Sequence, residues 1–244
     1  MRYALSLLLA ATCTLANAAA VSGQGTWEAT LKGRDLDGDL SNGHEAYYDT
    51  VLNITWLASP NQTRMNWQAA TKWADQLTVG GFSDWRLPNT KPVNGVSFQT
   101  VEPGASPQTI QSYAGDSDIG WNITSTRSEL SHLYYVTLGN TGEYDTKGKY
   151  QIGHSLTNSG PFINLDNTIT SYWSAASYPL PQPDYEDFAL YFNVYTGAQN
   201  YAFIGNRYLA WAVRDGDVAA VPEPESLVLM GVGLAALAVR RRSS

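Results

Sequence analysis

Alternation of apolar and polar side chains is clearest in the last third of the chain. In residues 188–195, Phe, Leu, Phe and Val alternate with Ala, Tyr, Asn and Tyr, which is the pattern of a strand with one buried face. Shorter apolar runs follow at residues 201–204 and 208–214, and Gly197 and Gly205 mark the turns between the runs. This order predicts an antiparallel meander of three strands.

The spacing changes to that of a helix in two places. Apolar side chains fall on one helical face between Asn66, a predicted N-cap, and Leu77. A second apolar stripe ends at Gly139, and Thr126 and Glu129 ahead of it have the spacing of a capping box. Two amphipathic helices are therefore expected, each with its apolar face in the core.

The other segments predict short strands and long loops. Residues 25–32 alternate weakly, as in an edge strand, and residues 46–57 predict two short strands that meet at a turn around Asp49. Residues 89–121 and 142–167 are polar and rich in turn residues, which indicates loops. The fold class that follows is α+β: a single domain in which two helices pack on a mostly antiparallel sheet.

A corner follows the first predicted helix. Gly80 and Gly81 can end a helix in the left-handed conformation, and the proline that comes later prevents the helix from continuing. The corner motif consists of Asp84, Trp85, Arg86, Leu87 and Pro88. We expect this motif to pin the helix against the sheet, and the alternative is a corner that contacts a ligand.

The first 20 residues have the features of a secretory signal. Arg2 supplies the positive start, residues 5–11 form an apolar core, and Ala16-Asn17-Ala18 is a small-x-small cleavage site. The single cysteine, Cys13, lies inside this segment. We therefore expect export through the secretion translocon and a mature chain without disulfides.

The other end of the chain combines a short motif, an apolar run and a basic cluster. These are Pro222, Glu223 and Pro224, then residues 227–239, then Arg240, Arg241 and Arg242. The apolar run is short beside the ~20 residues of a stable membrane span, and the basic cluster would stay cytoplasmic. The order resembles the PEP-CTERM sorting signal of exported bacterial proteins. This resemblance implies processing by a membrane exosortase in a Gram-negative bacterium that makes exopolysaccharide, and the alternative is a plain C-terminal anchor.

These assignments divide the chain into three parts. They are a signal peptide at residues 1–20, a domain at residues 21–220, and a sorting signal with a short transmembrane helix at residues 221–244. We expect export through the inner membrane, transient anchoring by the C-terminal helix, and a final place at the cell surface or in the extracellular matrix. The net charge is −7 at pH 7, which does not favour nucleic acid or an anionic lipid face as a partner.

An acidic run near the start of the domain is a candidate metal site. Asp35, Asp37 and Asp39 are spaced two residues apart, and Gly38 supplies a turn. Hard cations bind clustered oxygens, so the run resembles the opening of a calcium loop, although it departs from the EF-hand pattern. An acidic solvated turn is the favoured alternative, and no cofactor other than this candidate Ca²⁺ is expected.

The chain has no catalytic motif. The only histidines are His44, His132 and His154, which lie far apart in the sequence and lack zinc spacing. No nucleophile elbow, phosphate loop or dinucleotide fingerprint is present. A glycosidase needs only two carboxylates, and the candidates are Asp116 with Asp118, or Asp184 with Glu186 and Asp187. Such groups occur on any acidic surface, so we expect a protein that is not an enzyme.

Several separated motifs resemble the Lcl C-terminal domain family of bacterial surface proteins. They are residues 49–56, 67–77, 83–88, Glu129, 172–174 and 212–214. The resemblance implies an α+β fold akin to C-type lectin-like domains, with adhesion or glycan binding in place of catalysis. A cysteine found in some members is missing here, which excludes a disulfide-stabilised version.

The resemblance and the aromatic content together suggest a glycan-binding face. On the strand at residues 188–195, the face opposite the predicted core carries Tyr191, Asn193 and Tyr195, and the following turn brings Tyr201 beside it. We expect these residues, with the loop at 89–121, to bind an extracellular polysaccharide of a biofilm. The alternatives are tyrosines that pack under the loops, a purely structural matrix protein, and a polysaccharide hydrolase.

Overall fold

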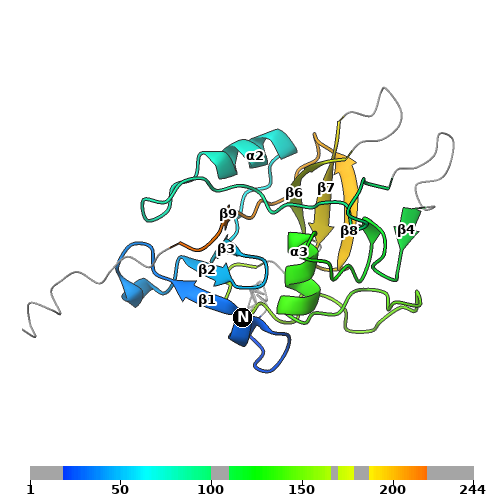
Figure 1. Ribbon diagram of the computed structural model, residues 1–244, viewed down its shortest axis with the longest axis horizontal. Helices are drawn as coiled ribbons and strands as arrows, with labels where there is room; N and C mark the ends of the chain where they lie inside the picture. Colours follow the sequence, from blue (N-terminus) through cyan, green and yellow to red (C-terminus); the bar gives the residue numbers. More distant parts are fainter. Residues whose placement is uncertain (1–18, 100–109, 166–169, 179–186, 219–244) are drawn as a thin grey trace, which may run out of the picture.

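Two β-sheets and several short helical segments form the described part of the domain. The computed structural model describes residues 19–99, 110–165, 170–178 and 187–218 (Figure 1). The proposed signal peptide up to residue 18, the sorting residues from Pro222 to Arg242, and Asp184 with Glu186 lie outside the described residues. Within the described ranges, no helix combines the length and the hydropathy that crossing a membrane requires.

The first sheet joins the two ends of the domain. Its strand order is β1-β2-β3-β9, and every neighbouring pair is antiparallel. The strands are β1 (Leu31–Arg34), β2 (Ala46–Asp49), β3 (Ile54–Leu57) and β9 (Val213–Asp215). The turn between β2 and β3 forms where the sequence predicts it, because the buried Asp49 carboxylate accepts hydrogen bonds from the backbone N–H groups of Val51 and Leu52.

The second sheet has five strands in the order β4-β5-β8-β7-β6. These strands are β4 (Gln111–Ser112), β5 (Ile119–Gly120), β6 (Ser171–Ser177), β7 (Phe188–Asn193) and β8 (Ala198–Phe203). The β4–β5 pair is parallel and the other pairs are antiparallel. The predicted loop at 89–121 therefore supplies the edge strand β4 and its neighbour β5 to this sheet.

The longest helix, α2 (Trp67–Asp75), begins as predicted. The Asn66 side chain accepts a hydrogen bond from the N–H of Ala69, and Ala70 and Ala74 are fully buried. The second predicted helix is α3 (Glu129–His132), which continues as a π-helical turn, η3 (Leu133–Thr137). A one-turn helix α1 (Trp27–Thr30) and a 3₁₀ turn η1 (Leu40–Asn42) flank β1.

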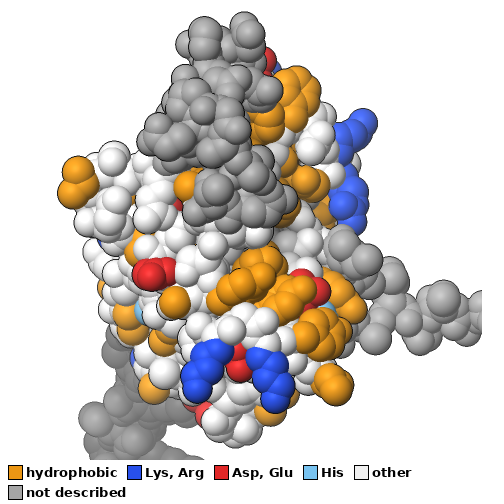
Figure 2. All heavy atoms as spheres, turned by 90° about the vertical axis from the view of Figure 1, so that its right-hand side faces the viewer, with side chains coloured by type: hydrophobic (Ala, Val, Ile, Leu, Met, Phe, Trp, Pro, Cys, Tyr) orange, Lys and Arg blue, Asp and Glu red, His pale blue; other side chains and the backbone are white. Residues whose placement is uncertain are grey.

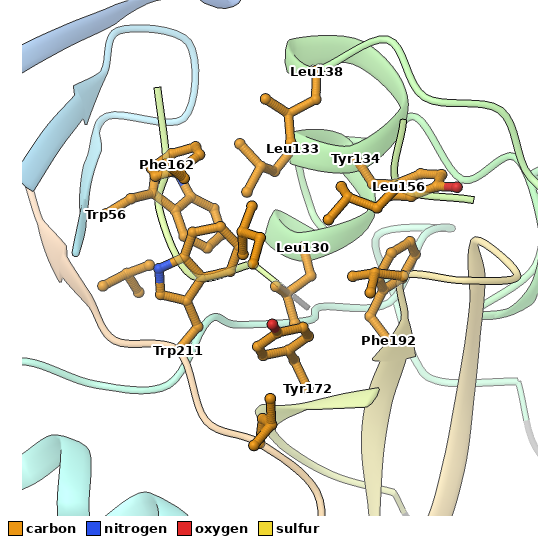
Figure 3. Close-up of a cluster of buried hydrophobic side chains, with 14 of the residues drawn as sticks. Trp56, Leu130, Leu133, Tyr134, Leu138, Leu156, Phe162, Tyr172, Phe192 and Trp211 are labelled. Atoms are coloured by element: carbon orange, nitrogen blue, oxygen red, sulfur yellow. The ribbon is translucent and has the colours of Figure 1, made fainter. Parts of the chain in front are cut away.

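An aromatic core lies between the two sheets and α3 (Figure 3). The Trp56 and Trp211 ring centres are 5.0 Å apart, and the Phe162 ring meets Trp211 edge-on at 4.9 Å. The Trp211 indole also donates a 2.7 Å hydrogen bond to the carbonyl of Leu57 in β3. Rings of this size bury large apolar areas, so the cluster ties the sheets together.

Three predictions about the elements differ from the structure, the first of them in part. The edge strand predicted at residues 25–32 begins only at Leu31, where β1 starts at the edge of the first sheet, because α1 occupies Trp27–Thr30. The predicted third strand of the meander does not stay beside β8. Residues 208–212 instead bond Met65 and the β6 backbone, and β9 then pairs with β3 in the other sheet. The capping box does not form, since the Glu129 carboxylate is bound elsewhere.

Glu129 is bound to the corner motif, where a half-buried network forms around Arg86. The Arg86 guanidinium donates two 2.9 Å hydrogen bonds to the Glu129 carboxylate and further hydrogen bonds to Asp215. The Arg86 backbone also pairs with Val213 of β9, with both N–H to O distances at 2.8 Å. Burial by itself lowers the pKa of Arg86, but the bonds and charges of Glu129 and Asp215 raise it above its usual value.

The other residues of the corner motif are structural as well. Trp85 is 2% exposed and packs with Leu36 and Ala212, and its indole donates to the carbonyl of Phe82. Asp84 adopts a left-handed φ of 64°. Leu87 and the backbone of Pro88 meet the second sheet, since the Pro88 carbonyl accepts from Ala175 of β6. The corner motif therefore contacts both α2 and the second sheet, against which α2 packs.

Strand β7 is covered on both faces, which corrects the prediction of one open face. Leu190 packs with Ile119 and Tyr178, and Phe192 lies in the aromatic core beside Tyr134. On the opposite face, Ala189 is fully buried and packs with Ala70 and Ala74 of α2. Tyr191 lies beside them, and its ring centre is 4.8 Å from that of Tyr208.

Burial also changes the acid–base behaviour of Tyr191. Loss of solvent raises the pKa of its phenol to about 12, and the neighbouring Tyr208 contributes in the same direction. The folded protein therefore favours the neutral phenol. The stabilising contribution is fully present below the unfolded pKa of about 10 and is lost as the pH rises toward 12.

The two carboxylates on Arg86 are expected to differ in their contribution to stability. Glu129→Gln should lower the free energy of unfolding by about 2 to 4 kcal/mol, because the Glu129 side chain is only 12% exposed and its loss leaves Arg86 without its inner partner. Asp215→Asn should cost less than about 1 kcal/mol, because that side chain is 80% exposed. Urea denaturation measures both, and equal costs would contradict this ranking.

The Tyr191 phenol is expected to make the domain sensitive to alkali. Tyr191→Phe removes the ionisable group but keeps the ring, so its melting temperature should fall less than that of the parent between about pH 9 and pH 11. Tyr195→Phe serves as the matched control, because Tyr195 lies in the exposed turn after β7. Its melting temperature should fall as the parent's does. The same fall in the Tyr191→Phe variant would refute the role of this phenol.

Candidate functional site

The four predicted glycan-binding residues do not share one surface. Tyr191 lies under α2, and Tyr201 pairs with Leu190, so its side chain is on the other face of the sheet. The Tyr201 ring stacks on Tyr178, with ring centres 4.7 Å apart. Asn193 holds the following turn, since its side-chain oxygen accepts from the N–H groups of Tyr195 and Thr196. Of the four, only Tyr195 is exposed.

Tyr195 belongs to a continuous array of rings that the sequence does not reveal. We call this array the aromatic surface and define it by six residues: Tyr113, Trp121, Tyr144, Tyr150, His154 and Tyr195. Each ring meets the next, with centres between 4.9 and 6.1 Å apart. Figure 2 faces the end of the domain at which β4 lies and shows hydrophobic side chains gathered on it.

Three tyrosines of this array are exposed to solvent. Tyr150 is 53% exposed, Tyr113 39% and Tyr195 36%. Trp121 is buried and forms the floor, because Tyr113 stacks on it with the ring planes 19° apart. Exposed tyrosine hydroxyls beside a fixed tryptophan combine apolar area with hydrogen-bonding groups, a combination typical of binding surfaces.

Local hydrogen bonds hold these rings in place. The Asn122 amide donates to the carbonyls of Tyr113 and Tyr144, which fixes the two loops to each other. Residues 143–151 form a small hairpin in which Tyr144 pairs with Tyr150 and the Asp145 carboxylate accepts from two backbone N–H groups at its tip. Gly148 at that tip has a left-handed φ of 75° and lies against the Tyr113 ring.

A further contact connects the hairpin to the second sheet. The N–H of Glu143 donates a 2.7 Å hydrogen bond to the carbonyl of Thr196, next to Tyr195. The rings therefore come from the 112–122 segment, the hairpin, His154 and the β7–β8 turn. Since these segments are far apart in the sequence, periodicity could not have grouped them. The available signal was the density of isolated aromatic residues in the two predicted loops.

The acidic run folds into a different group from the one predicted. Carboxylate oxygens of Asp35, Asp37 and Glu45 lie within 4.8 Å of one another, whereas the Asp39 side chain accepts from the N–H of Ser41. Glu45 and Asp35 also accept from the backbone of this turn, at Leu36 and Gly38. Oxygen ligands of this kind suit Ca²⁺, and the turn is equally well held by its own hydrogen bonds.

The histidines and the carboxylate pair have separate environments. His44 lies against Tyr47, His132 is buried with its Nδ1 atom 2.7 Å from the carbonyl oxygen of Thr124, and His154 lies in the aromatic surface. Asp118 is buried and accepts from the N–H groups of Val93 and Gln99, so it braces the 93–99 loop. Asp116 accepts from the Ser112 hydroxyl.

Comparisons with known proteins find two family matches, one within the described domain and one at the C-terminal motif. The family model of the Lcl C-terminal domain matches residues 45–156, and that of the PEP-CTERM protein-sorting motif matches residues 220–242. The chain is also similar to the uncharacterised protein YaiT of Salmonella typhimurium, with 28% identity over 149 residues. The match covers 58% of this chain and 13% of YaiT, so the chain spans a small part of that relative. No solved structure shows significant similarity.

The matched range of the first model contains much of the described domain. It runs from Glu45, just before β2, to Leu156, and includes the corner motif, α2 and α3. Five of the six rings of the aromatic surface fall inside it, and only Tyr195 falls outside. The second model covers the Pro-Glu-Pro motif and the arginine cluster. The chain is therefore similar to the Lcl C-terminal domain over residues 45–156 and to the PEP-CTERM protein-sorting motif over residues 220–242, and the sorting motif supports an exported protein that an exosortase sorts.

Proposed function

We propose that this protein is a non-catalytic surface or matrix protein that binds extracellular polysaccharide through its aromatic surface. The observation that carries the proposal is the chain of six rings with three exposed tyrosines. A sugar ring has an apolar face made of C–H groups and an edge of hydroxyls. Tyrosine rings stack on the apolar face of the sugar, and tyrosine hydroxyls form hydrogen bonds with the sugar hydroxyls, so the chemistry of the two surfaces matches.

The sorting motif supports the same proposal from a second direction. It directs the protein out of the cell, and exopolysaccharide is the polymer that a bacterial exoprotein of a biofilm meets there. We also propose that the fold is akin to C-type lectin-like domains, a relation that rests on the family resemblance. A calcium-dependent mode of binding would use the acidic turn with Ca²⁺, whereas binding through the aromatic surface needs no ion. Polymer binding is therefore to be measured with and without calcium.

A purely structural matrix protein and a polysaccharide hydrolase are the competing functions. A structural protein would leave the exopolysaccharide of its host unbound in a pull-down assay. A hydrolase would release reducing sugars from that polymer. An exposed apolar surface can also bind another protein, in which case a protein partner would compete with the polymer for the same tyrosines.

Sorting is expected to remove the C-terminal segment. The extracellular form should end near Pro222 and lack the cluster Arg240 to Arg242, because the exosortase acts at the sorting motif. Intact-mass spectrometry of the protein recovered from the medium or matrix measures this directly. An extracellular form that retains the arginine cluster would contradict the proposed processing.

The exposed tyrosines are expected to carry polymer binding without carrying the fold. Tyr113→Ala, Tyr150→Ala and Tyr195→Ala should each weaken binding about tenfold, equivalent to about 1.4 kcal/mol, and leave the melting temperature close to that of the parent. Phe203→Ala is the matched control, because Phe203 is 49% exposed but lies outside the aromatic surface. Unchanged binding in the three tyrosine variants would refute the proposed surface.

A further inference from the structure

The arrangement of the rings bears on how a polysaccharide lies on the protein. The aromatic surface, called the strip below, joins its rings one to the next, from the mutually contacting Tyr113, Trp121 and Tyr144 through Tyr150 and His154 to Tyr195. The two ends of the strip come from different elements, the 112–122 segment and the β7–β8 turn. A single sugar ring can contact only one or two neighbouring side chains of such a strip.

The spacing along the strip is regular. Successive ring centres are 4.9, 6.1, 5.3 and 5.0 Å apart from Trp121 to Tyr195. These are ordinary contact distances between aromatic rings, so the series of contacts from Tyr113 to Tyr195 presents more rings than one sugar unit can cover. Exposed tyrosines stand at both ends and in the middle of the strip, so a chain that lies along it meets an accessible ring repeatedly.

We infer that the aromatic surface binds an internal stretch of an extended, unbranched polysaccharide, with several consecutive sugar units along the strip, and does not bind a single terminal sugar. This inference rests on the proposed function and specifies its ligand. Terminal-sugar recognition depends on one site that surrounds one residue with polar groups. The strip instead offers repeated, similar contacts, which suit a polymer made of repeated, similar units.

The rigidity of the strip supports this mode of binding. The Asn122 amide, the Asp145 carboxylate and the Glu143–Thr196 hydrogen bond fix the segments that carry the rings. A surface that is already ordered loses little conformational entropy on binding. Contacts with successive sugar units therefore add affinity until the ligand reaches the end of the strip.

The experiment uses the mature exported protein and the exopolysaccharide of its host. Partial acid hydrolysis of that polymer gives fractions of one to eight sugar units, and calorimetry measures the dissociation constant of each. The constant should fall at least tenfold between the two-unit and five-unit fractions and then level off. Fractions that bind equally well at every length, with the polymer still bound, would overturn the inference and leave the proposed function intact. Loss of all binding, to the polymer included, would refute both.

Variants at the two ends of the strip sharpen the test. Tyr195→Ala should bind the two-unit fraction as the parent does and lose most of the gain between two and five units. Tyr113→Ala should shorten the strip from the other end in the same way. Phe203→Ala should keep the length dependence of the parent. A uniform loss across all lengths in both end variants would show a single compact site and overturn the inference.

Discussion

The ion pair between Arg86 and Glu129 is the constraint on which the arrangement of the domain depends. Arg86 lies in the corner that follows α2, Glu129 is the first residue of α3, and the same guanidinium reaches Asp215 at the end of β9. Glu129 also binds the backbone of Asn89 in both directions, as acceptor through its carboxylate and as donor through its N–H. A single half-buried charge pair thus fixes a corner, a helix and a strand that are far apart in the sequence.

This constraint explains why local patterns predict some parts of the fold and not others. The β2–β3 turn, the N-cap at Asn66 and the buried alanines of α2 depend on neighbours in the sequence, and the sequence predicts them. The role of Glu129 depends on Arg86, 43 residues away, so its local spacing to Thr126 suggests a capping box that does not form. The path of residues 208–215 likewise depends on distant partners, because Leu209 bonds to the backbone of β6 and β9 pairs with β3.

The same distinction applies to the candidate site. Alternation in residues 188–195 correctly gives a strand, but whether its second face is open depends on α2, which is more than one hundred residues earlier in the chain. That helix covers Tyr191 and leaves Tyr195, beyond the end of β7, exposed. The rings that join Tyr195 come from segments that read as loops, and only their hydrogen bonds to each other bring them into one surface.

The way in which the last strand is fastened has a consequence for maturation. Two 2.7 Å hydrogen bonds join Arg34 to Asp217, and the Val218 side chain is buried beside Leu36 and Trp85, while the matched sorting motif begins at residue 220. The chain is thus bound to the first sheet and its core up to Val218, two residues before the matched motif begins. Proteolysis within the motif takes no strand and no buried side chain of the described domain with it. Release from the membrane therefore leaves the folded domain complete.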